Sequence, residues 1–355
     1  MKRLYTLLAG VIGIIIALLI GLCVLNQSDA TSGDTLTIYN WGDYIDPKLI
    51  TEFENQTGYH VNYETFDSNE AMFTKIKQGG THYDIVIPSD YMIQKMKREH
   101  LLVPLDKSKI HGLSNIDPQF LNQPFDPHNQ YSIPYFWGTL GIVYNPQKLK
   151  GIPMQHWKDL WNPKLKDQIL LIDGAREVMG LALNRLGYSV NTEDKAQLHQ
   201  AYRALCQLKP NVKAIVADEM KTYMANGEAD IAVTFSGEAN DMMEKNPQLR
   251  YVVPEEGSNL WFDNIVIPKT VTNKEAAYAF INFMLEPKHA TQNAEYIGYA
   301  TPNWKAKQLL PKEMRENKAM YPNKSSMKHL EVYKDLGSYW LGVYNDYFLD
   351  FKMQH

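Results

Sequence analysis

Aromatic residues and carboxylates recur together where predicted strands end. Trp41 and Asp43 follow the strand expected at Thr35–Asn40, and Glu177 lies one helical turn beyond the strand expected at Gln168–Ile172. A carboxylate accepts charge-assisted hydrogen bonds from an ammonium group. An aromatic ring packs against methylenes and attracts a cation to its face, which contributes about 0.5–2 kcal/mol per ring. The combination predicts a site for a linear alkyl ammonium compound.

The candidate residues share one position in the expected fold. In open α/β sheets, ligands bind beyond the carboxyl ends of the strands. The residues at those ends, or on the extended stretch Leu260–Pro268, include Trp41, Asp43, Tyr44, Ser89, Asp90, Tyr91, Glu177, Glu238, Trp261 and Asp263.

Each candidate also has an ordinary structural interpretation. Asp43 could cap the helix that follows it, and Glu177 could form a surface ion pair with Arg176. Trp41 and Trp261 could be core tryptophans, since core packing uses aromatic residues as well. No single residue justifies a function, but their shared placement at strand ends favours a binding site.

Strand and helix signals alternate from Thr35 onward. Strands are expected at Thr35–Asn40, Val61–Thr65 and Tyr83–Pro88, with helices that begin at Asp46-Pro47 and after Ser68. A β-α-β-α-β order predicts a parallel sheet with helices on both faces.

A second α/β unit is expected over roughly 142–257. Its strands are Gln168–Ile172 and Ile231–Phe235, and a helix is expected at about Ala175 to Leu186. Two extended stretches, Ile133–Tyr144 and Leu260–Pro268, could carry the chain between the units. The sequence therefore predicts two α/β lobes that share connecting strands.

The N-terminus has the layout of an export signal. Lys2 and Arg3 precede an uncharged apolar run from Leu7 to Leu25, and small residues follow at 28–30. This layout predicts a signal peptide over residues 1–30. Because the run approaches the length that spans a bilayer, an uncleaved anchor through residues 7–25 is one alternative. A lipoprotein at Cys23 is another, although Leu22 stands where a small residue is expected. In all three cases the rest of the chain is exported, and a periplasmic location is expected.

Several functional classes are disfavoured. A net charge of −4 with no long basic run argues against nucleic acid as a partner. We find no zinc-spaced Cys and His residues, and we expect no metal and no cofactor. Paired carboxylates beside aromatics also occur in glycosidases. The chain has no nucleophile elbow or phosphate loop, so we do not expect an enzyme.

Several distinctive motifs resemble the spermidine/putrescine-binding proteins of bacterial ABC transporters. The resemblance extends from about Leu36 to the end of the chain and keeps the motifs in order. They are Tyr39–Tyr44, Tyr83–Ser89, Tyr131–Gly138, Asp173–Val178, Trp261–Asp263 and Ile297–Asn303.

The resemblance implies a two-lobed periplasmic solute-binding fold, type II-like, with a hinge between the lobes. Lobe one would comprise residues 31–140 and 260–308, and lobe two residues 141–259 and 309–355. The implied ligand is a polyamine, putrescine or spermidine. The implied partners are inner-membrane permease and ATPase subunits of an ABC transporter, and we expect a monomer. The alternative is a protein of the same fold that binds another cationic or amine-bearing solute.

The resemblance also implies roles for individual residues. Acids of the family hold the ligand nitrogens, and aromatics hold its methylenes. The matching acids are Asp43, Glu177 and Asp263. The matching aromatics are Trp41, Tyr44, Phe235, Trp261 and Tyr299, with Ser89 and Tyr91 beside them.

Three positions depart from the spermidine-preferring pattern. Gly42 stands in place of a threonine or similar residue, Gly174 in place of a second acid, and Tyr333 in place of a glutamine that helps to bind ligand. Glu238 lies three residues after Phe235, where putrescine-specific relatives carry an acid. We therefore expect putrescine to bind at least comparably to spermidine. The alternative is that Glu238 is a helix N-terminal acid that points to solvent.

Overall fold

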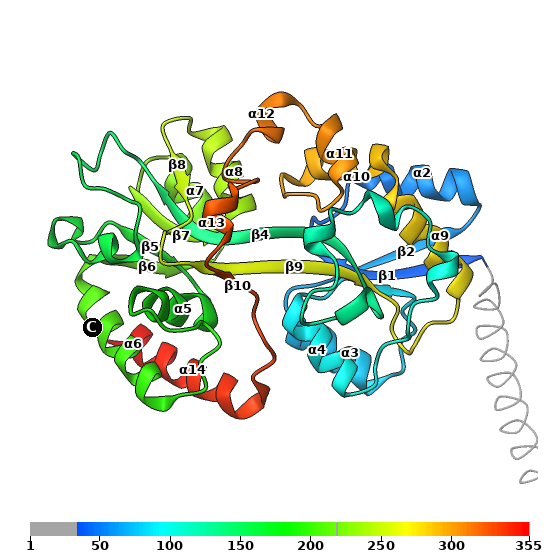
Figure 1. Cartoon of the computed structure of the whole chain (residues 1–355), viewed down its shortest axis with the longest axis horizontal. Coiled ribbons are helices and arrows are strands. Elements are labelled where there is room, and N and C mark those ends of the chain that lie inside the picture. The colour runs from blue at the N-terminus through cyan, green and yellow to red at the C-terminus, as the bar shows by residue number, and fades with distance from the viewer. Residues whose placement is uncertain (1–33, 218, 355) are drawn as a thin grey trace, which may run out of the picture.

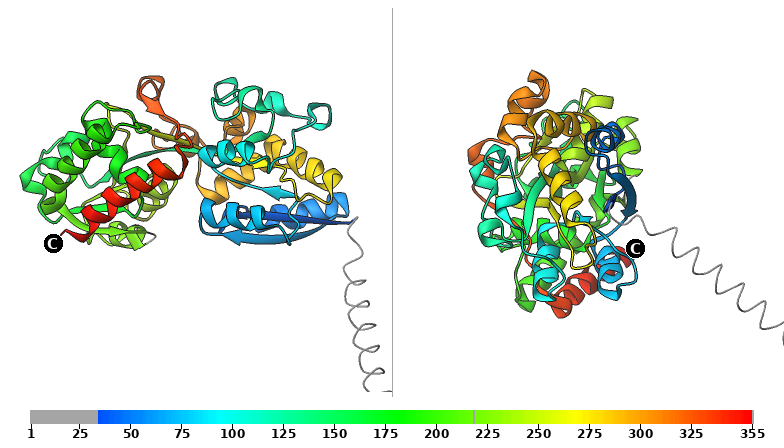
Figure 2. Two further views of the ribbon diagram at one scale, coloured as in Figure 1. Left: turned by 90° about the horizontal axis from the view of Figure 1, so that it is seen from below. Right: turned by 90° about the vertical axis from the view of Figure 1, so that its right-hand side faces the viewer.

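The computed structural model describes residues 34–217 and 219–354, so the expected export signal at 1–30 lies outside the described residues. Two α/β bodies lie side by side and are joined by two long strands, β4 (Ser132–Tyr144) and β9 (Ser258–Val266) (Figure 1). The two-lobed architecture and both connecting strands are thus confirmed. Figure 2 shows the narrow crossing between the bodies from a second direction.

The first body is built on the strand order β2-β1-β3-β9-β4. β1 pairs in parallel with β2 and β3, whereas β9 runs antiparallel to β3 and β4. The elements before β4 are β1 (Thr35–Trp41), α2 (Pro47–Thr57), β2 (His60–Phe66), α3 (Asn69–Gln78), β3 (Ile85–Val86) and α4 (Asp90–Arg98). Those after β9 are α9 (Lys274–Leu285), α10 (Pro287–Ile297), α11 (Trp304–Leu309), α12 (Lys312–Arg315), α13 (Lys324–Met327) and β10 (Leu330–Glu331).

The second body continues the sheet in the order β4-β7-β5-β6, with β8 also paired to β4. Its strands are β5 (Ile169–Ile172), β6 (Val212–Val216), β7 (Ile231–Phe235) and β8 (Arg250–Val252). Its helices are α5 (Ala175–Arg185), α6 (Lys195–Leu208), α7 (Glu219–Ala225), α8 (Ser236–Lys245) and the C-terminal α14 (Gly337–Met353).

Local signals account for the first helices. Asp46 accepts a hydrogen bond from the Lys48 backbone N–H at 3.0 Å, and Pro47 occupies the first turn of α2. Gly58 then ends that helix at φ 77°, in the left-handed region that glycine tolerates best. Ser68 caps α3 in the same way, at 3.2 Å. These predicted helix starts are confirmed.

The third predicted strand is shorter than expected. The expectation was Tyr83–Pro88, whereas β3 comprises only Ile85 and Val86. The backbone N–H groups of Asp84 and Ile87 still donate to β1, at 2.8 and 3.2 Å. The segment therefore stays extended beside β1, and the prediction was wrong in length rather than in kind.

The buried apolar side chains form separate cores on either side of the crossing. Tyr39 and Phe262 belong to the first core, and Ile231 and Tyr344 to the second. The sequence assigned residues 309–355 to lobe two, yet Leu310 and Met320 pack in the first core. The chain rejoins the second core only at Leu336. The lobe limits stay a prediction. For this segment, we now expect the chain to pass from lobe one to lobe two between residues 332 and 336.

Candidate functional site

A cleft of about 770 Å³ opens between the two bodies. Its lining includes the end of β1, the interior of β9, the N-terminal turns of α4, α5 and α8, and the segments after α10 and β10. All twelve residues proposed from the sequence line it: Trp41, Asp43, Tyr44, Ser89, Tyr91, Glu177, Phe235, Glu238, Trp261, Asp263, Tyr299 and Tyr333.

Asp263 is a buried carboxylate of the cleft whose two oxygens are both hydrogen-bonded. Its side chain belongs to β9, where the two bodies meet, and the residue is 7% exposed. The Ser89 hydroxyl donates to Oδ1 at 2.6 Å, and the Tyr44 hydroxyl donates to Oδ2 at 2.7 Å. Each oxygen thus has one donor and keeps a lone pair for another.

Burial raises the pKa of Asp263 from 3.8 to about 6, although the hydrogen bonds from Ser89 and Tyr44 oppose the shift. Desolvation disfavours the charged form of an acid, and a nearby cation restores it. Asp263 is therefore a carboxylate that gains from binding a positive group.

A polar network behind Asp263 fixes its donors. The Asn69 amide donates to the Ser89 hydroxyl at 3.0 Å and to the Tyr91 hydroxyl at 3.1 Å, and it accepts from the Ser89 backbone N–H at 3.1 Å. On the other side, the Tyr135 hydroxyl donates to the Tyr44 carbonyl at 2.7 Å. Sequence reasoning missed Asn69, because a polar residue beside a helix start is normally a capping residue.

Asp90 lies at the same predicted strand end as Ser89 and Tyr91, but the sequence indicated no specific role for it. Its buried carboxylate accepts the backbone N–H of Tyr91 at 2.6 Å and that of Phe262 at 3.0 Å. Burial raises its pKa well above the usual range, and those two bonds oppose the shift. By joining α4 to β9, Asp90 fixes Trp261 and Asp263, the neighbours of Phe262, relative to Ser89.

Aromatic rings form a continuous wall along the cleft. The Trp261 ring lies 5.4 Å from that of Tyr299 and 6.1 Å from that of Phe235. The rings of Tyr299 and Tyr44 also pack edge to face, with 5.6 Å between their centroids. The Trp41 ring lies 4.6 Å from that of Phe66, so it combines a core contact with a position at the cleft.

Two glycines make room for these rings. A Cβ at Gly138 in β4 would lie 2.5 Å from Cζ2 of Trp261, and one at Gly237 would overlap the Tyr299 ring. Tyr299 follows α10 of the first body, whereas Gly237 lies in the first turn of α8 in the second. The Tyr299 ring therefore bridges the two bodies.

Glu177 lies in the first turn of α5, at the second-body end of the cleft. Burial raises its pKa, while its own backbone N–H and Arg176 oppose the shift. Arg176 donates to the Val190 carbonyl at 3.2 Å and covers the Tyr333 ring at 4.2 Å. These contacts direct the Arg176 side chain away from Glu177. They therefore disfavour the surface ion pair that the sequence left open.

The two remaining acids occupy the rim. Asp43 is exposed in a turn at φ 47°, and Asp46 rather than Asp43 caps α2. Glu238 accepts a hydrogen bond from the Thr234 hydroxyl, one turn earlier in the chain, and is half-buried at the cleft. Its side chain thus lies along the cleft wall.

The cleft is strongly acidic. Lys221 is the single lysine of its lining within residues 34–217 and 219–354. The carboxylates of the lining are Asp43, Asp67, Asp90, Glu177, Glu238, Asp241, Glu244, Asp263 and Glu295. Such a surface attracts cations and focuses their approach.

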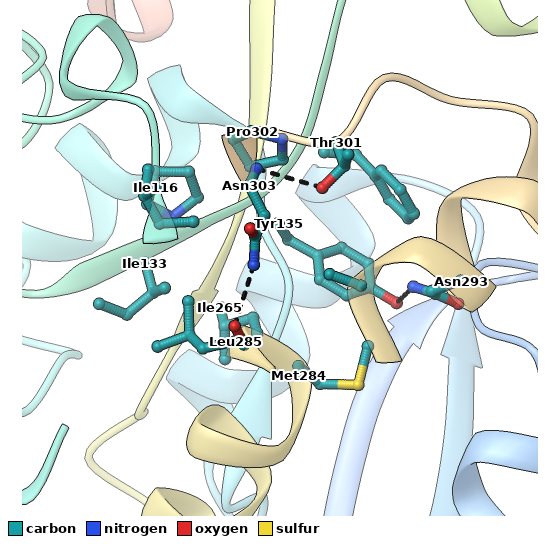
Figure 3. Close-up of a pocket in the computed structure, with 13 residues that line it drawn as sticks. Ile116, Ile133, Tyr135, Ile265, Met284, Leu285, Asn293, Thr301, Pro302 and Asn303 are labelled. Atoms are coloured by element: carbon teal, nitrogen blue, oxygen red, sulfur yellow. Dashed lines mark hydrogen bonds between the residues drawn. The ribbon is translucent and has the colours of Figure 1, made fainter. Parts of the chain in front are cut away.

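A second cavity, of about 20 Å³, lies inside the first body behind Tyr135 (Figure 3). Its polar edge includes Asn293, whose amide donates to the Tyr135 hydroxyl at 2.8 Å, and Thr301. The volume suits about one water molecule and is too small for an organic ligand. The residues around this cavity pack against Tyr135, which in turn holds the Tyr44 backbone through its hydroxyl.

The part of the chain that the structure describes lacks two other functional features. No group of three or more His, Cys, Asp or Glu side chains there could hold a metal ion. No helix there is both long enough and apolar enough to cross a membrane.

Comparisons with known proteins agree on one family. A family model described as bacterial extracellular solute-binding protein matches residues 48–322. The spermidine/putrescine-binding periplasmic protein of Salmonella typhimurium is 39% identical over 338 residues, which cover 95% of this chain and 96% of that protein. The protein of that name from Escherichia coli is 40% identical, with coverages of 92% and 94%.

A solved structure extends the likeness to three dimensions. It is the spermidine/putrescine ABC transporter substrate-binding protein PotD of Streptococcus pneumoniae, crystallised with calcium and HEPES. It is 64% identical, has a TM-score of 0.84, and the match covers 90% of this chain and 99% of that one. The periplasmic solute-binding fold expected from the sequence is confirmed.

The raised pKa of Asp263 predicts how that carboxyl affects stability. An acid whose pKa is higher in the folded state stabilises the fold below pH 4, and this contribution is lost as the pH rises through about 6. A shift from 3.8 to about 6 corresponds to up to about 3 kcal/mol. We therefore expect Asp263→Asn to raise the melting temperature at pH 7.5 and to have little effect at pH 4.

The control is Asp67→Asn, which makes the same substitution at an exposed acid of the cleft. Thermal unfolding of the three proteins at both pH values checks the expectation. A lower melting temperature for Asp263→Asn at pH 7.5 would contradict it.

Proposed function

The chain belongs to the bacterial extracellular solute-binding proteins, and from that premise we propose that it captures a polyamine, putrescine or spermidine, and delivers it to an ABC transporter. The family serves solute transport rather than catalysis, and its members act outside the cytoplasm. The relatives named for spermidine and putrescine cover almost the whole chain.

The observation that carries the proposal is the buried Asp263 carboxylate beside the Trp261 and Tyr299 rings. An ammonium group bound to Asp263 would stabilise the carboxylate charge that burial has deprived of solvating water. The two hydroxyl donors would stay in place. The rings would cover the adjoining methylenes and attract the cation through their faces. A sugar or a carboxylic acid would gain nothing comparable from this set.

The distribution of acids suits a ligand with more than one positive group. Asp263 lies where the bodies meet, Glu177 lies at the second body, and Asp43 lies at the rim of the first. An unpaired buried cation is costly, so each nitrogen needs its own acceptor or water. Separated carboxylates with rings between them match nitrogens separated by methylenes.

Ligand binding should also favour closure of the lobes. A cation between carboxylates of both bodies contacts more groups in a closed form than in an open one, and ligands shift populations by such differences. The closed protein would then dock on permease and ATPase subunits in the membrane. We propose that it acts as a monomer in the periplasm after export by its N-terminal signal. The alternative is that residues 7–25 stay uncleaved and tether it to the inner membrane.

The first test is calorimetry of the mature chain with putrescine, spermidine, cadaverine, spermine and a sugar. We expect binding of putrescine and spermidine and none of the sugar. Asp263→Asn should weaken polyamine binding by roughly tenfold or more, because a hydrogen bond to a charged group contributes about 1.5–3 kcal/mol.

The stability measurement separates lost binding from lost folding, since the same variant should melt higher at pH 7.5. Binding of none of the amines would refute the proposed function. Binding of a different amine alone would instead favour the alternative of another amine-bearing solute.

Closure generates a second test. Small-angle scattering should show a smaller radius of gyration when putrescine is added. Gly237→Ala should displace the Tyr299 ring, because its Cβ would overlap that ring. Loss of one ring contact should reduce affinity by about two- to thirtyfold.

Gly342→Ala is the matched control, because a Cβ at Gly342 meets nothing within 4 Å. An unchanged radius with saturating ligand would argue against closure from an open form. Equal affinities for the two alanine variants would remove the role of Tyr299 in ligand binding.

Ligand choice generates a third test at Glu238 and Gly174. We expect Glu238→Ser to weaken putrescine binding by about tenfold, because an acceptor for an ammonium group is lost. Gly174→Asp should then shift preference toward spermidine by adding an acid at the second-body end. The structure adds a condition, since a Cβ at Gly174 would collide with the Glu177 carboxylate and force it to move.

The measurement is calorimetry of both ligands with the two single variants and the double variant. Glu228→Ser is the control, since it removes an exposed acid of the same body. If Glu238→Ser alters both affinities equally or neither, then Glu238 does not set the choice.

A further inference from the structure

The cleft face of β9 carries one residue that no motif identified. Asn259, Trp261 and Asp263 are two residues apart, and alternate side chains of a strand project to the same face. All three line the cleft, whereas Phe262 between them lies in the first core. The strand thus presents an amide, an aromatic ring and a carboxylate in a row across the two bodies.

The orientation of the Asn259 amide is fixed from behind. Its Nδ2 donates to the Glu331 carbonyl at 3.2 Å and to the Leu260 carbonyl at 3.4 Å. The opposite orientation would direct Oδ1 at two carbonyl oxygens, so the hydrogen-bond network determines which atom is the oxygen. The amide can therefore offer only an acceptor to the cleft.

That acceptor is unsatisfied. Asn259 is 1% exposed, and its Oδ1 receives no hydrogen bond from any described residue. Buried polar atoms in native proteins are nearly always paired, so an exception requires an explanation. An N–H donor from a bound ligand provides one.

The position of Asn259 identifies which part of a ligand it would meet. It pairs with Glu331 of β10, two residues before Tyr333, and α5 packs against β9. Asn259 therefore lies toward the second-body end of the cleft, where Glu177 is half-buried. At this end Gly174 leaves the chain without a second carboxylate.

We propose that Asn259 is a ligand-binding residue whose Oδ1 accepts an N–H from a terminal ammonium group of the polyamine. The proposal rests on the proposed function and adds a selectivity element to it. Asn259 and Asp263 are four positions apart along the strand, a span of about 13 Å. Putrescine, with four methylenes, is shorter than this spacing. Spermidine, with seven methylenes and a third nitrogen, can approach both residues.

The test compares two substitutions in the full mature chain. Asn259→Ala removes both the acceptor and the Nδ2 bonds to the backbone. Asn259→Asp removes the same Nδ2 bonds but keeps an oxygen facing the ligand. Calorimetry at pH 8 measures spermidine and putrescine with each variant and with the wild type, and thermal unfolding confirms that each variant is folded.

We expect Asn259→Ala to weaken spermidine binding by about tenfold or more. Putrescine binding should change by a smaller factor. Asn259→Asp should bind spermidine at least as tightly as the wild type, because a carboxylate is a stronger acceptor for an ammonium group.

Two results would overturn the proposal. One is equal loss of affinity in both variants, which would assign Asn259 a purely structural role through its Nδ2 bonds. The other is wild-type affinity in Asn259→Ala. A wild-type protein that binds neither polyamine would instead refute the proposed function itself.

Discussion

The cost of removing the Asp263 carboxylate from water determines much of the architecture around it. Burial raises its pKa to about 6. Without a ligand, the carboxylate therefore needs hydrogen-bond donors that stabilise its charge but do not cancel it. Hydroxyl groups meet this need, because Ser89 and Tyr44 donate hydrogen bonds but carry no charge. The Asn69 amide and the Tyr135 hydroxyl then fix those donors, and a small internal cavity lies behind Tyr135.

Strand ends were the informative part of the sequence. Trp41 and Asp43, or Phe235 and Glu238, could be placed at a common edge because parallel strands end on the same side of a sheet. Periodicity and capping located the helices equally well, as at Asp46 and Ser68. The positions of these residues thus followed from local pattern plus one topological rule, and the structure places them around one cleft.

The roles of residues that act through distant partners could not be found in this way. Asp90 resembles an ordinary acid in a helical first turn, and its role depends on Phe262, which is 172 positions away. Gly237 resembles a helix-start glycine until Tyr299 is placed against it. Leu310 and Met320 lie in a segment predicted for lobe two, and their packing in the first core likewise emerges only in three dimensions.

The crossing strands β4 and β9 are hydrogen-bonded to each other as an antiparallel pair, from Ser132 with Val266 to Thr139 with Leu260. Such a ribbon resists stretching and sliding, because either would break several backbone hydrogen bonds together, whereas two-stranded ribbons accommodate twist readily. Twisting and bending of this ribbon are therefore the soft relative motions of the lobes. Under the proposed closure, occupancy of a deeply buried site changes the relative orientation of the lobes, which a membrane partner that contacts both lobes would detect without touching the ligand.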